Sequence, residues 1–333
     1  MDGPIVLVLG ADRDRPPPGI EAAAGHVELR YAPDLDRASQ AIGDADAVFE
    51  WIHDPAVLPA VWGSAARLRW IQTVSDGVDS MLFPALIESD VVVTNARGVY
   101  EEPIAEWVIG AMLAFTTGMH RSILDQQRRE WTTGRTVERL AGARLVIVGP
   151  GPIGRATAWR ARALGMSVTV VGRRARVDAS LGDVVGVDRL HDELARADHV
   201  LDALPLTEET RRLFDWRAFA SMPRPARFYN VGRGDTVDEP ALVDALRTGS
   251  ISGAALDVVA TEPLPVESPL WTMPNVIVSP HISGDAEGWE HRAVAVFVDN
   301  ARRFATGEPL VNQVDKRAGF VTDEPVAQGR SMP

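Results

Sequence analysis

The sequence of 333 residues contains no cysteine. This absence excludes disulfide bonds, thiolate metal sites and cysteine nucleophiles. The seven histidines show no His-x-x-x-His spacing, and no segment has the dense carboxylates of a calcium-binding loop. We therefore expect no metal site, and any chemistry must rest on other side chains.

Positive charge is also scarce. Lysine and arginine number 34 against 46 aspartates and glutamates, a formal net charge of −12, and no long basic run occurs. Nucleic acids and anionic membranes bind basic surfaces, so we expect neither as a partner.

Long apolar runs are missing as well. The most apolar longer stretch, residues 107–119, is too short for a bilayer and includes Thr116, Thr117 and Gly118. We expect a buried helix there. The N-terminal residues lack the cationic region, apolar segment and cleavage site of a signal peptide, so a cytoplasmic protein is expected.

The remaining composition is that of a folded domain protein, with 46% hydrophobic and 24% charged residues. The length exceeds what one core usually supports, which predicts two domains. Short β-branched runs alternate with helical patterns, so we expect an α/β fold with parallel sheets covered by helices. The predicted strands form two sets: 5–9, 47–49, 68–73 and 91–94, then 145–148, 168–171, 199–203, 227–230, 254–258 and 276–278.

A glycine-rich turn opens the second set. Gly149, Gly151 and Gly154 follow an apolar strand and lead into a helix predicted over 155–164. This arrangement permits a tight turn, close approach of the backbone to a pyrophosphate and close packing of helix on strand. Pro152 and Ile153 lie in the same turn, where helix N-terminal amides favour phosphate charge. A dinucleotide site is the prediction, against a purely structural glycine turn.

The end of the next strand indicates which dinucleotide binds. NAD-binding versions place an acid there, whereas this sequence has Gly172 followed by Arg173, Arg174 and Arg176. Guanidinium groups suit a 2′-phosphate, so we expect NADP to be preferred, with NAD as the weaker alternative. A solvated basic loop would read the same way.

Three later residues supply the groups that reduction of a keto acid needs. Arg233, Glu262 and His281 each follow a predicted strand. A permanent cation clamps a carboxylate and a keto oxygen, an imidazole exchanges a proton near neutral pH, and a carboxylate sets its tautomer. Taken singly, each residue reads as structural; together they favour a catalytic site. Trp51, in the first domain, is a candidate wall of the substrate pocket.

The chain resembles the D-isomer-specific 2-hydroxyacid dehydrogenase family, in particular its glyoxylate/hydroxypyruvate reductase branch. The resemblance rests on the glycine turn, the catalytic segments and further motifs in the same order. These further motifs are Val74–Asp79, Thr94–Val99, Pro103–Glu106, Ala203–Thr210, Pro269–Trp271 and Gly307–Leu310.

The resemblance implies two Rossmann-like or flavodoxin-like domains. Residues 1–100 and 284–333 would form the substrate domain, and residues 101–283 would form an inserted NAD(P)-binding Rossmann domain, commonly at the centre of a homodimer. It implies that Arg233 clamps the substrate, that His281 carries the proton and that Glu262 orients His281. Further expected cofactor contacts are Pro205, Thr210, Val231, Asp257, His281 and Gly284.

Two positions depart from the family pattern. The backbone at Gly77 and Val78 would meet the substrate carboxylate, but Asp76 precedes them where a small residue is common. An acid there disfavours an anion unless it points away. Gly172 is the other departure, and it supports the change of nucleotide.

The sequence therefore predicts an NADPH-preferring reductase of a small 2-keto acid. A nucleotide-binding sensor or corepressor-like protein on the same fold is the alternative, although the intact Arg233, Glu262 and His281 argue against it. Formate oxidation ranks lower, because that branch pairs its histidine with glutamine.

Overall fold

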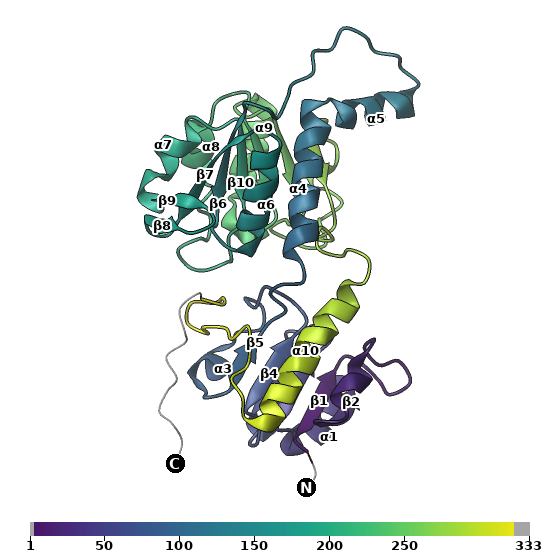
Figure 1. Cartoon of the computed structure of the whole chain (residues 1–333). Helices are drawn as coiled ribbons and strands as arrows, with labels where there is room; N and C mark the ends of the chain where they lie inside the picture. The colour runs from purple at the N-terminus through teal and green to yellow at the C-terminus, as the bar shows by residue number, and fades with distance from the viewer. Residues whose placement is uncertain (1–2, 323–333) are drawn as a thin grey trace. The chain divides into compact units, whose positions relative to one another are not determined.

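The computed structural model describes residues 3–322, and its chain divides into two compact units (Figure 1). One unit runs to Tyr100 and resumes at Glu287, and the other comprises Glu101–Ala286. Residues 323–333, which we assigned to the substrate domain, lie outside the described residues. Each unit is an α/β fold built on a mainly parallel sheet.

The first unit holds a five-stranded parallel sheet in the order β2-β1-β3-β4-β5, the doubly wound order of flavodoxin-like domains. The strands are β1 (Ile5–Leu9), β2 (Glu28–Ala32), β3 (Ala47–Glu50), β4 (Trp70–Thr73) and β5 (Val92–Thr94). The helices are η1 (Ile20–Ala23), α1 (Leu35–Ala41), η2 (Ile42–Asp44), α2 (Val57–Val61), η3 (Trp62–Ser64), α3 (Pro84–Glu88) and α10 (Trp289–Thr306).

Helix α10 belongs to this unit because its apolar face completes the core. The ring of Phe297 stacks on Phe49 and Trp70, with centroids 4.1 and 5.8 Å apart. The buried amide of Asn300 donates to Gln72 and to the carbonyl of Val311. A segment distant in sequence thus closes one face of the sheet, which makes the unit discontinuous.

The second unit contains an eight-stranded sheet in the order β13-β12-β11-β10-β6-β7-β9-β8, parallel except for β8. The strands are β6 (Arg144–Val148), β7 (Ser167–Gly172), β8 (Arg176–Asp178), β9 (Gly182–Gly186), β10 (His199–Asp202), β11 (Arg227–Asn230), β12 (Gly253–Leu256) and β13 (Val276–Val278). The helices are α4 (Glu101–Thr116), α5 (Met119–Arg128), α6 (Pro152–Ala163), η4 (Val187–Arg189), α7 (Leu190–Leu194), α8 (Trp216–Ser221), η5 (Gly234–Thr236), α9 (Glu239–Thr248) and η6 (Pro269–Trp271).

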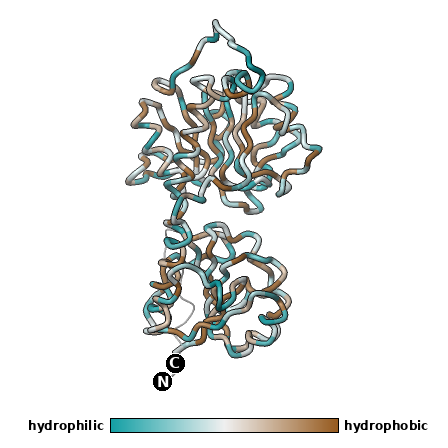
Figure 2. Tube along the Cα trace, turned by 90° about the vertical axis from the view of Figure 1, so that its right-hand side faces the viewer, coloured by the Kyte–Doolittle hydropathy of each residue, from teal (hydrophilic) through white to brown (hydrophobic). Residues whose placement is uncertain are grey.

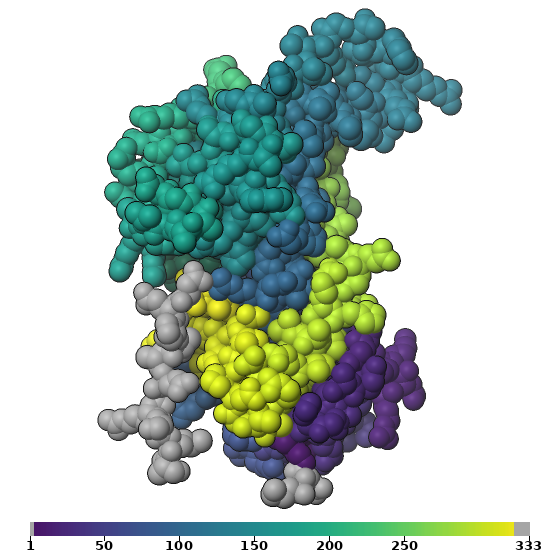
Figure 3. All heavy atoms as spheres, viewed as in Figure 1, coloured from purple at the N-terminus to yellow at the C-terminus, as the bar shows by residue number. Residues whose placement is uncertain are grey.

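Apolar residues line both faces of this sheet. Figure 2 shows them along the central strands, between the helical layers of the unit. Helix α6 packs on α4 over one face, whereas α8 and α9 contribute to the core on the other. Helix α5 and the extended residues 129–139 project from the body of this unit (Figure 3).

Three strands of the structure were not predicted from the sequence. Strand β2 was missed because its sequence Glu-Leu-Arg-Tyr-Ala carries charge and it lies at the edge of the sheet, where apolar alternation is weak. Strands β8 and β9 were missed because they are short and form an edge hairpin.

The helix bounds also differ from the prediction. The helix expected over 101–119 ends at Thr116, since Gly118 adopts φ 72° and starts α5 instead. The last helix, expected over 286–304, begins at Trp289 after Gly288, whose φ is 75°. Helix α6 starts at Pro152, three residues earlier than expected.

Candidate functional site

The glycine turn after β6 has the shape that its sequence predicts. Gly149 has φ 118°, and a Cβ there would lie 2.5 Å from the carbonyl oxygen of Ala203. A Cβ on Gly154 would lie 2.1 Å from the carbonyl oxygen of Gly149. Both positions therefore exclude every larger residue. These two glycines bring the turn against the β10 loop and against helix α6.

Gly151 is different, because its surroundings are open. It caps the N-terminus of α6 without a side-chain hydrogen bond to the helix, and nothing lies within 4 Å of where its Cβ would be. Pro152 takes the first helical position and Ile153 the next. The space beside Gly151 is open at this helix N-terminus, and helix N-terminal amides bind phosphate anions. The residues present thus fit a dinucleotide.

The loop after β10 lies beside this turn. Pro205 and Thr210 form one hydrogen-bonded unit, since the Thr210 hydroxyl donates to the Pro205 carbonyl over 2.7 Å. The amide of Thr207 in turn donates to Thr210 over 2.8 Å. Val231 is buried after β11, and its amide donates to the carbonyl of Asp202.

The turn after β7 exposes Arg173 and Arg174. Arg173 lies near Glu209: a backbone amide, the hydroxyl of Thr207 and the charge of Arg173 keep the pKa of that carboxyl below its usual range. A Cβ on Gly172 would lie 3.0 Å from Val184, 3.1 Å from Pro150 and 3.3 Å from the guanidinium of Arg176. The place where an NAD-binding acid would stand is therefore closely filled.

The acid nearest to this turn in sequence serves another purpose. Asp178 accepts a bidentate pair of hydrogen bonds from Arg155 at 2.6 and 2.7 Å. It also accepts from the backbone of Ser180 and Leu181. The Arg155 hydrogen bond, helped by these amides, holds the pKa of Asp178 far below its ordinary value. This carboxylate fastens the β8–β9 hairpin to α6.

Glu262 and His281 meet as the sequence predicts. His281 Nδ1 lies 2.8 Å from a Glu262 carboxylate oxygen, and the other oxygen accepts the Val259 amide at 3.1 Å. The hydrogen bond to Glu262 raises the pKa of His281 against the opposing effects of burial and of Arg233. Burial raises the pKa of Glu262, but hydrogen bonds from His281 and Val259 outweigh it and leave the pKa low. Because Nδ1 is engaged, Nε2 is the nitrogen left for a reacting group.

Asp257 shapes the loop that carries His281. One of its oxygens accepts the Ser279 hydroxyl at 2.5 Å and the Ile282 amide at 3.0 Å. The other accepts the amide of Ser283 at 3.1 Å and a short bond from the Ser283 hydroxyl. His281 has φ 56°, a left-handed conformation that costs free energy in a residue other than glycine. We predicted Asp257 as a cofactor contact from the resemblance; its buried role as the anchor of this loop was missed.

Arg233 lies in a tightly bonded loop after β11. Its carbonyl oxygen accepts hydrogen bonds from the side-chain amide of Asn230 at 3.1 Å and from the backbone amide of Thr236 at 3.2 Å. One guanidinium nitrogen donates to the carbonyl of Gly232 at 2.8 Å. These hydrogen bonds restrain the loop. Gly284, the last predicted cofactor contact, follows the His281 loop in the same unit.

The predicted substrate loop belongs to the first unit. Val78 is buried, while Asp76 and Gly77 are partly exposed. The Asn95 amide donates to the carbonyl of Asp76 at 2.6 Å and to its carboxylate at 3.1 Å. Asp76, which stands where the family commonly has a small residue, therefore has a hydrogen-bond partner for its carboxylate within the first unit.

Trp51 packs among aromatic rings in the same unit. Its ring stacks on Trp289 with centroids 6.1 Å apart and contacts Phe49 at the same distance. Nearby, His53 Nδ1 lies 3.0 Å from the buried carboxylate of Glu50, whose hydrogen bond raises the pKa of the histidine.

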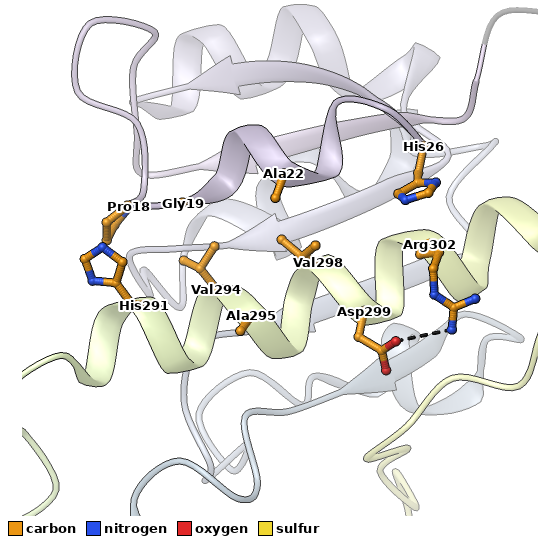
Figure 4. Close-up of a pocket in the computed structure, with 10 residues that line it drawn as sticks. All are labelled: Pro18, Gly19, Ala22, His26, His291, Val294, Ala295, Val298, Asp299 and Arg302. Carbon is orange, nitrogen blue, oxygen red and sulfur yellow. Dashed lines mark hydrogen bonds and ion pairs between the residues drawn. The ribbon is translucent and has the colours of Figure 1, made fainter.

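A groove of about 460 Å³ also lies in the first unit, between η1 and α10 (Figure 4). Its apolar part is lined by Ala22, Val294 and Val298. An ion pair between Asp299 and Arg302 stands at its edge, at 3.2 Å. None of the predicted site residues lines this groove, so it is separate from the chemistry described above.

Two findings concern the whole described part of the chain. Among residues 3–322, no helix is both long and apolar enough to cross a membrane. Within the same residues, no group of three or more histidine, aspartate or glutamate side chains is placed to hold a metal ion.

Comparison with known proteins identifies the family. Residues 109–283 match the NAD binding domain of the D-isomer specific 2-hydroxyacid dehydrogenases. The chain belongs to this family. It is 34% identical to the glyoxylate/hydroxypyruvate reductase B of Citrobacter koseri, an alignment covering 83% of this chain and 87% of that one. It is 35% identical to the enzyme of the same name from Pectobacterium carotovorum, over 75% of this chain and 80% of that one.

Solved structures of family members have the same fold as this chain. A dehydrogenase of this family from Aeromonas salmonicida matches with a TM-score of 0.81 at 31% identity, covering 95% of this chain and all of that one. A member from Xanthobacter autotrophicus, solved with NADPH, matches with a TM-score of 0.80 at 30% identity, over 96% and 100% of the two chains. The protein is thus a 2-hydroxyacid dehydrogenase that uses NAD(P), as its glycine turn predicts, and the two-sheet α/β architecture is confirmed.

Proposed function

We propose that this dehydrogenase reduces a small 2-keto acid of the glyoxylate or hydroxypyruvate type to the D-2-hydroxy acid, with NADPH preferred over NADH. The observation that supports it most is the hydrogen bond of 2.8 Å between His281 Nδ1 and Glu262, on loops of the unit that holds the glycine turn. Similar chains in Citrobacter koseri and Pectobacterium carotovorum carry the name glyoxylate/hydroxypyruvate reductase B.

The residues divide the work by their chemistry. When bound, the nicotinamide supplies the hydride. Arg233 provides a permanent positive charge for the carboxylate and for the negative charge that grows on the keto oxygen. His281 donates a proton to that oxygen from Nε2, while Glu262 stabilises the charged imidazole and fixes its tautomer. A well-placed proton donor contributes roughly 10²–10⁴ to the rate.

The preference for NADPH rests on the turn after β7. Gly172 leaves no acid for the ribose hydroxyls, and Arg173 and Arg174 stand exposed beside it. In this proposal they bind the 2′-phosphate by charge-assisted hydrogen bonds. Related structures from Sinorhizobium meliloti and Xanthobacter autotrophicus were solved with NADP and NADPH, at 27% and 30% identity.

The remaining contacts are also part of this proposal. Gly151, Pro152 and Ile153 offer amides to the pyrophosphate, and the other predicted contacts are Pro205, Thr210, Val231, Asp257 and Gly284. In the first unit, the loop of Asp76, Gly77 and Val78 contacts the substrate, whose carboxylate the backbone of Gly77 and Val78 receives, and Trp51 lines the pocket. The proposal also assigns residues 1–100 and 284–333 to a substrate domain and residues 101–283 to a nucleotide-binding domain.

We further propose a homodimer formed through the second unit. Helix α5 and the segment after it expose Met119, Ile123, Trp131 and Val137, with Trp131 94% exposed. A second copy of this chain would cover these side chains. Light scattering should give twice the chain mass for the wild type and a smaller mass for Trp131→Ser. A cytoplasmic location remains a prediction from the sequence.

The test is steady oxidation of NADPH by the purified protein with glyoxylate and hydroxypyruvate. We expect His281→Ala to lower kcat/KM by at least about 10², because the proton donor is lost. His191→Ala is the matched control, since that exposed histidine lies on α7 and contacts Ser221. Wild-type protein that binds NADPH but turns over no keto acid would favour the sensor-like alternative and refute the proposal.

A further inference from the structure

A carboxyl group lies buried beneath the Arg233 loop. Asp202 ends β10 and is 0% exposed. Its Oδ1 accepts the backbone amide of Leu204 at 3.1 Å, and its Oδ2 lies 2.5 Å from the hydroxyl of Thr236. Within residues 3–322 it has no ion-pair partner. The reaction scheme above gives this acid no role.

The positions of the hydrogen atoms around Thr236 decide its state. The same hydroxyl oxygen lies 2.5 Å from Asp202 Oδ2 and 2.5 Å from the carbonyl oxygen of Arg233. A hydroxyl carries one hydrogen, and both neighbours are acceptors when the carboxyl is ionised. Two oxygens at 2.5 Å need a proton between them, since such a contact without one is repulsive. Both contacts are satisfied when Asp202 supplies the second hydrogen.

This count gives one consistent chain of donors. The protonated Asp202 Oδ2 donates to the Thr236 hydroxyl, and the hydroxyl donates to the carbonyl of Arg233. The other two donors to that carbonyl, the Asn230 side chain and the Thr236 amide, approach at 3.1 and 3.2 Å. Of the three hydrogen bonds described above to the carbonyl oxygen of Arg233, the bond from the Thr236 hydroxyl is therefore the shortest.

The surroundings of Asp202 favour its neutral form. The titratable groups on neighbouring segments are Arg233, the Asp235–Arg211 ion pair near the surface, and Asp257 after β12. Further along β10 and its paired strand β11 lie His199, Arg227 and Tyr229, whereas the end of β6 offers Val148 and Gly149, which do not titrate. Burial raises the pKa of Asp202 to about 7, against the opposing hydrogen bonds from Thr236 and Leu204. This direction agrees with the hydrogen count.

We propose that Asp202 is a neutral carboxylic acid that positions Arg233 by holding its backbone carbonyl through the Thr236 hydroxyl. The claim that Asp202 positions Arg233 for the reaction rests on the proposed function, in which Arg233 binds the substrate. When Asp202 loses its proton, the Thr236 hydrogen turns to the carboxylate and the Arg233 carbonyl loses its shortest hydrogen bond. Asp202 and Thr236 are then positioning residues that touch no substrate.

The first experiment detects the proton directly. Infrared spectra of full-length protein carrying ¹³C-labelled aspartate side chains should show an isotope-shifted band of a neutral carboxylic acid at about pH 6. The band should be absent from Asp202→Asn and should fade in the wild type as the pH rises through about 7. No such band at that pH, or an unchanged band in the variant, would overturn the proposal. The wild-type titration decides the matter even if the variant does not fold.

The second experiment tests the positioning. Thr236→Val removes the hydroxyl at nearly constant shape. We expect about a tenfold loss of kcat/KM with glyoxylate and faster hydrogen exchange of the backbone amides at positions 236 and 237. Thr236→Ser should restore both. The kcat/KM of Asp202→Asn, divided by that of the wild type, should rise up to about tenfold from about pH 6 to about pH 8, because the amide cannot ionise.

The outcomes separate this inference from the proposed function. Wild-type kinetics and exchange in Thr236→Val would refute the positioning role. If the wild type reduced no keto acid, the proposed function would fail, whereas the carboxyl band and the exchange of the Arg233 loop would still support or contradict the inference.

Discussion

Replacing Asp202 by asparagine should change how the stability of the second unit depends on pH. The pKa of this fully buried acid is raised from 3.8 to about 7 in the folded chain. In the unfolded chain the acid ionises near pH 4, so between about pH 4 and 7 the folded state binds more protons. Stability from this group is thus complete below about pH 4 and is lost as the pH rises to about 7.

The size of the effect follows from the shift. A difference of about 3 units, at about 1.4 kcal/mol each, makes the wild type up to about 4 kcal/mol less stable at about pH 8 than a chain without this ionisation. The asparagine side chain of the variant cannot ionise and can still donate to Thr236. For a unit of this size, about 4 kcal/mol corresponds to roughly 8–16 °C in melting temperature.

The assay is urea unfolding of wild type and Asp202→Asn at intervals between about pH 4 and 8, followed by circular dichroism and by hydrogen exchange of β10 amides. The free energy of unfolding of the variant should increase steadily relative to that of the wild type as the pH rises. Asp192→Asn is the control, because that acid is exposed on α7 and should give a nearly constant difference. A stability difference between wild type and Asp202→Asn that does not change with pH would refute the reasoning.

Three further predictions concern the reaction. Arg233→Lys should lower kcat/KM by about 10² or more in a folded protein, because an ammonium cannot form the forked contact; near-normal kinetics would contradict the clamp. Reduction needs protonated His281, so its rate should fall as the pH rises through the His281 pKa. Glu262→Gln removes the charge that raises this pKa, and the fall should move to lower pH in a pH–rate profile; an unmoved profile would count against the pair. Gly172→Asp with Arg173→Ala should move the kcat/KM ratio toward NADH by about tenfold or more, and an unchanged ratio would argue against the phosphate site.

The features predicted well are those that local sequence determines. The glycine turn was predicted from the spacing of its glycines between an apolar strand and a helix. The structure gives the steric reason for two of them, because a Cβ on Gly149 or Gly154 would lie within 2.5 Å of backbone atoms. Strand β6 was found because residues 145–148 are buried and form an apolar run. Edge strands such as β2 carry a mixed pattern, so their existence depends on the neighbour with which they pair.

The candidate site divides in the same way. Arg233, Glu262 and His281 were predicted from residue type and position after strands, and the contact between Glu262 and His281 is present at 2.8 Å. The anchoring of the His281 loop by Asp257 had no sequence signal beyond an acid at a strand end. The link from Asp202 to Thr236 joins residues 34 positions apart, and neither type is unusual where it stands.

The sequence by itself determined the alternation of strands and helices, the conformation of the nucleotide turn and the kinds of chemical group available. These depend on steric limits and hydrophobic periodicity, which act between near neighbours. The tertiary structure decided which acids are buried, which are paired and which keep their proton. Burial and hydrogen-bond geometry arise when distant strand ends come together, so Asp178, Asp202 and Asp257 share one side-chain chemistry and have three different roles.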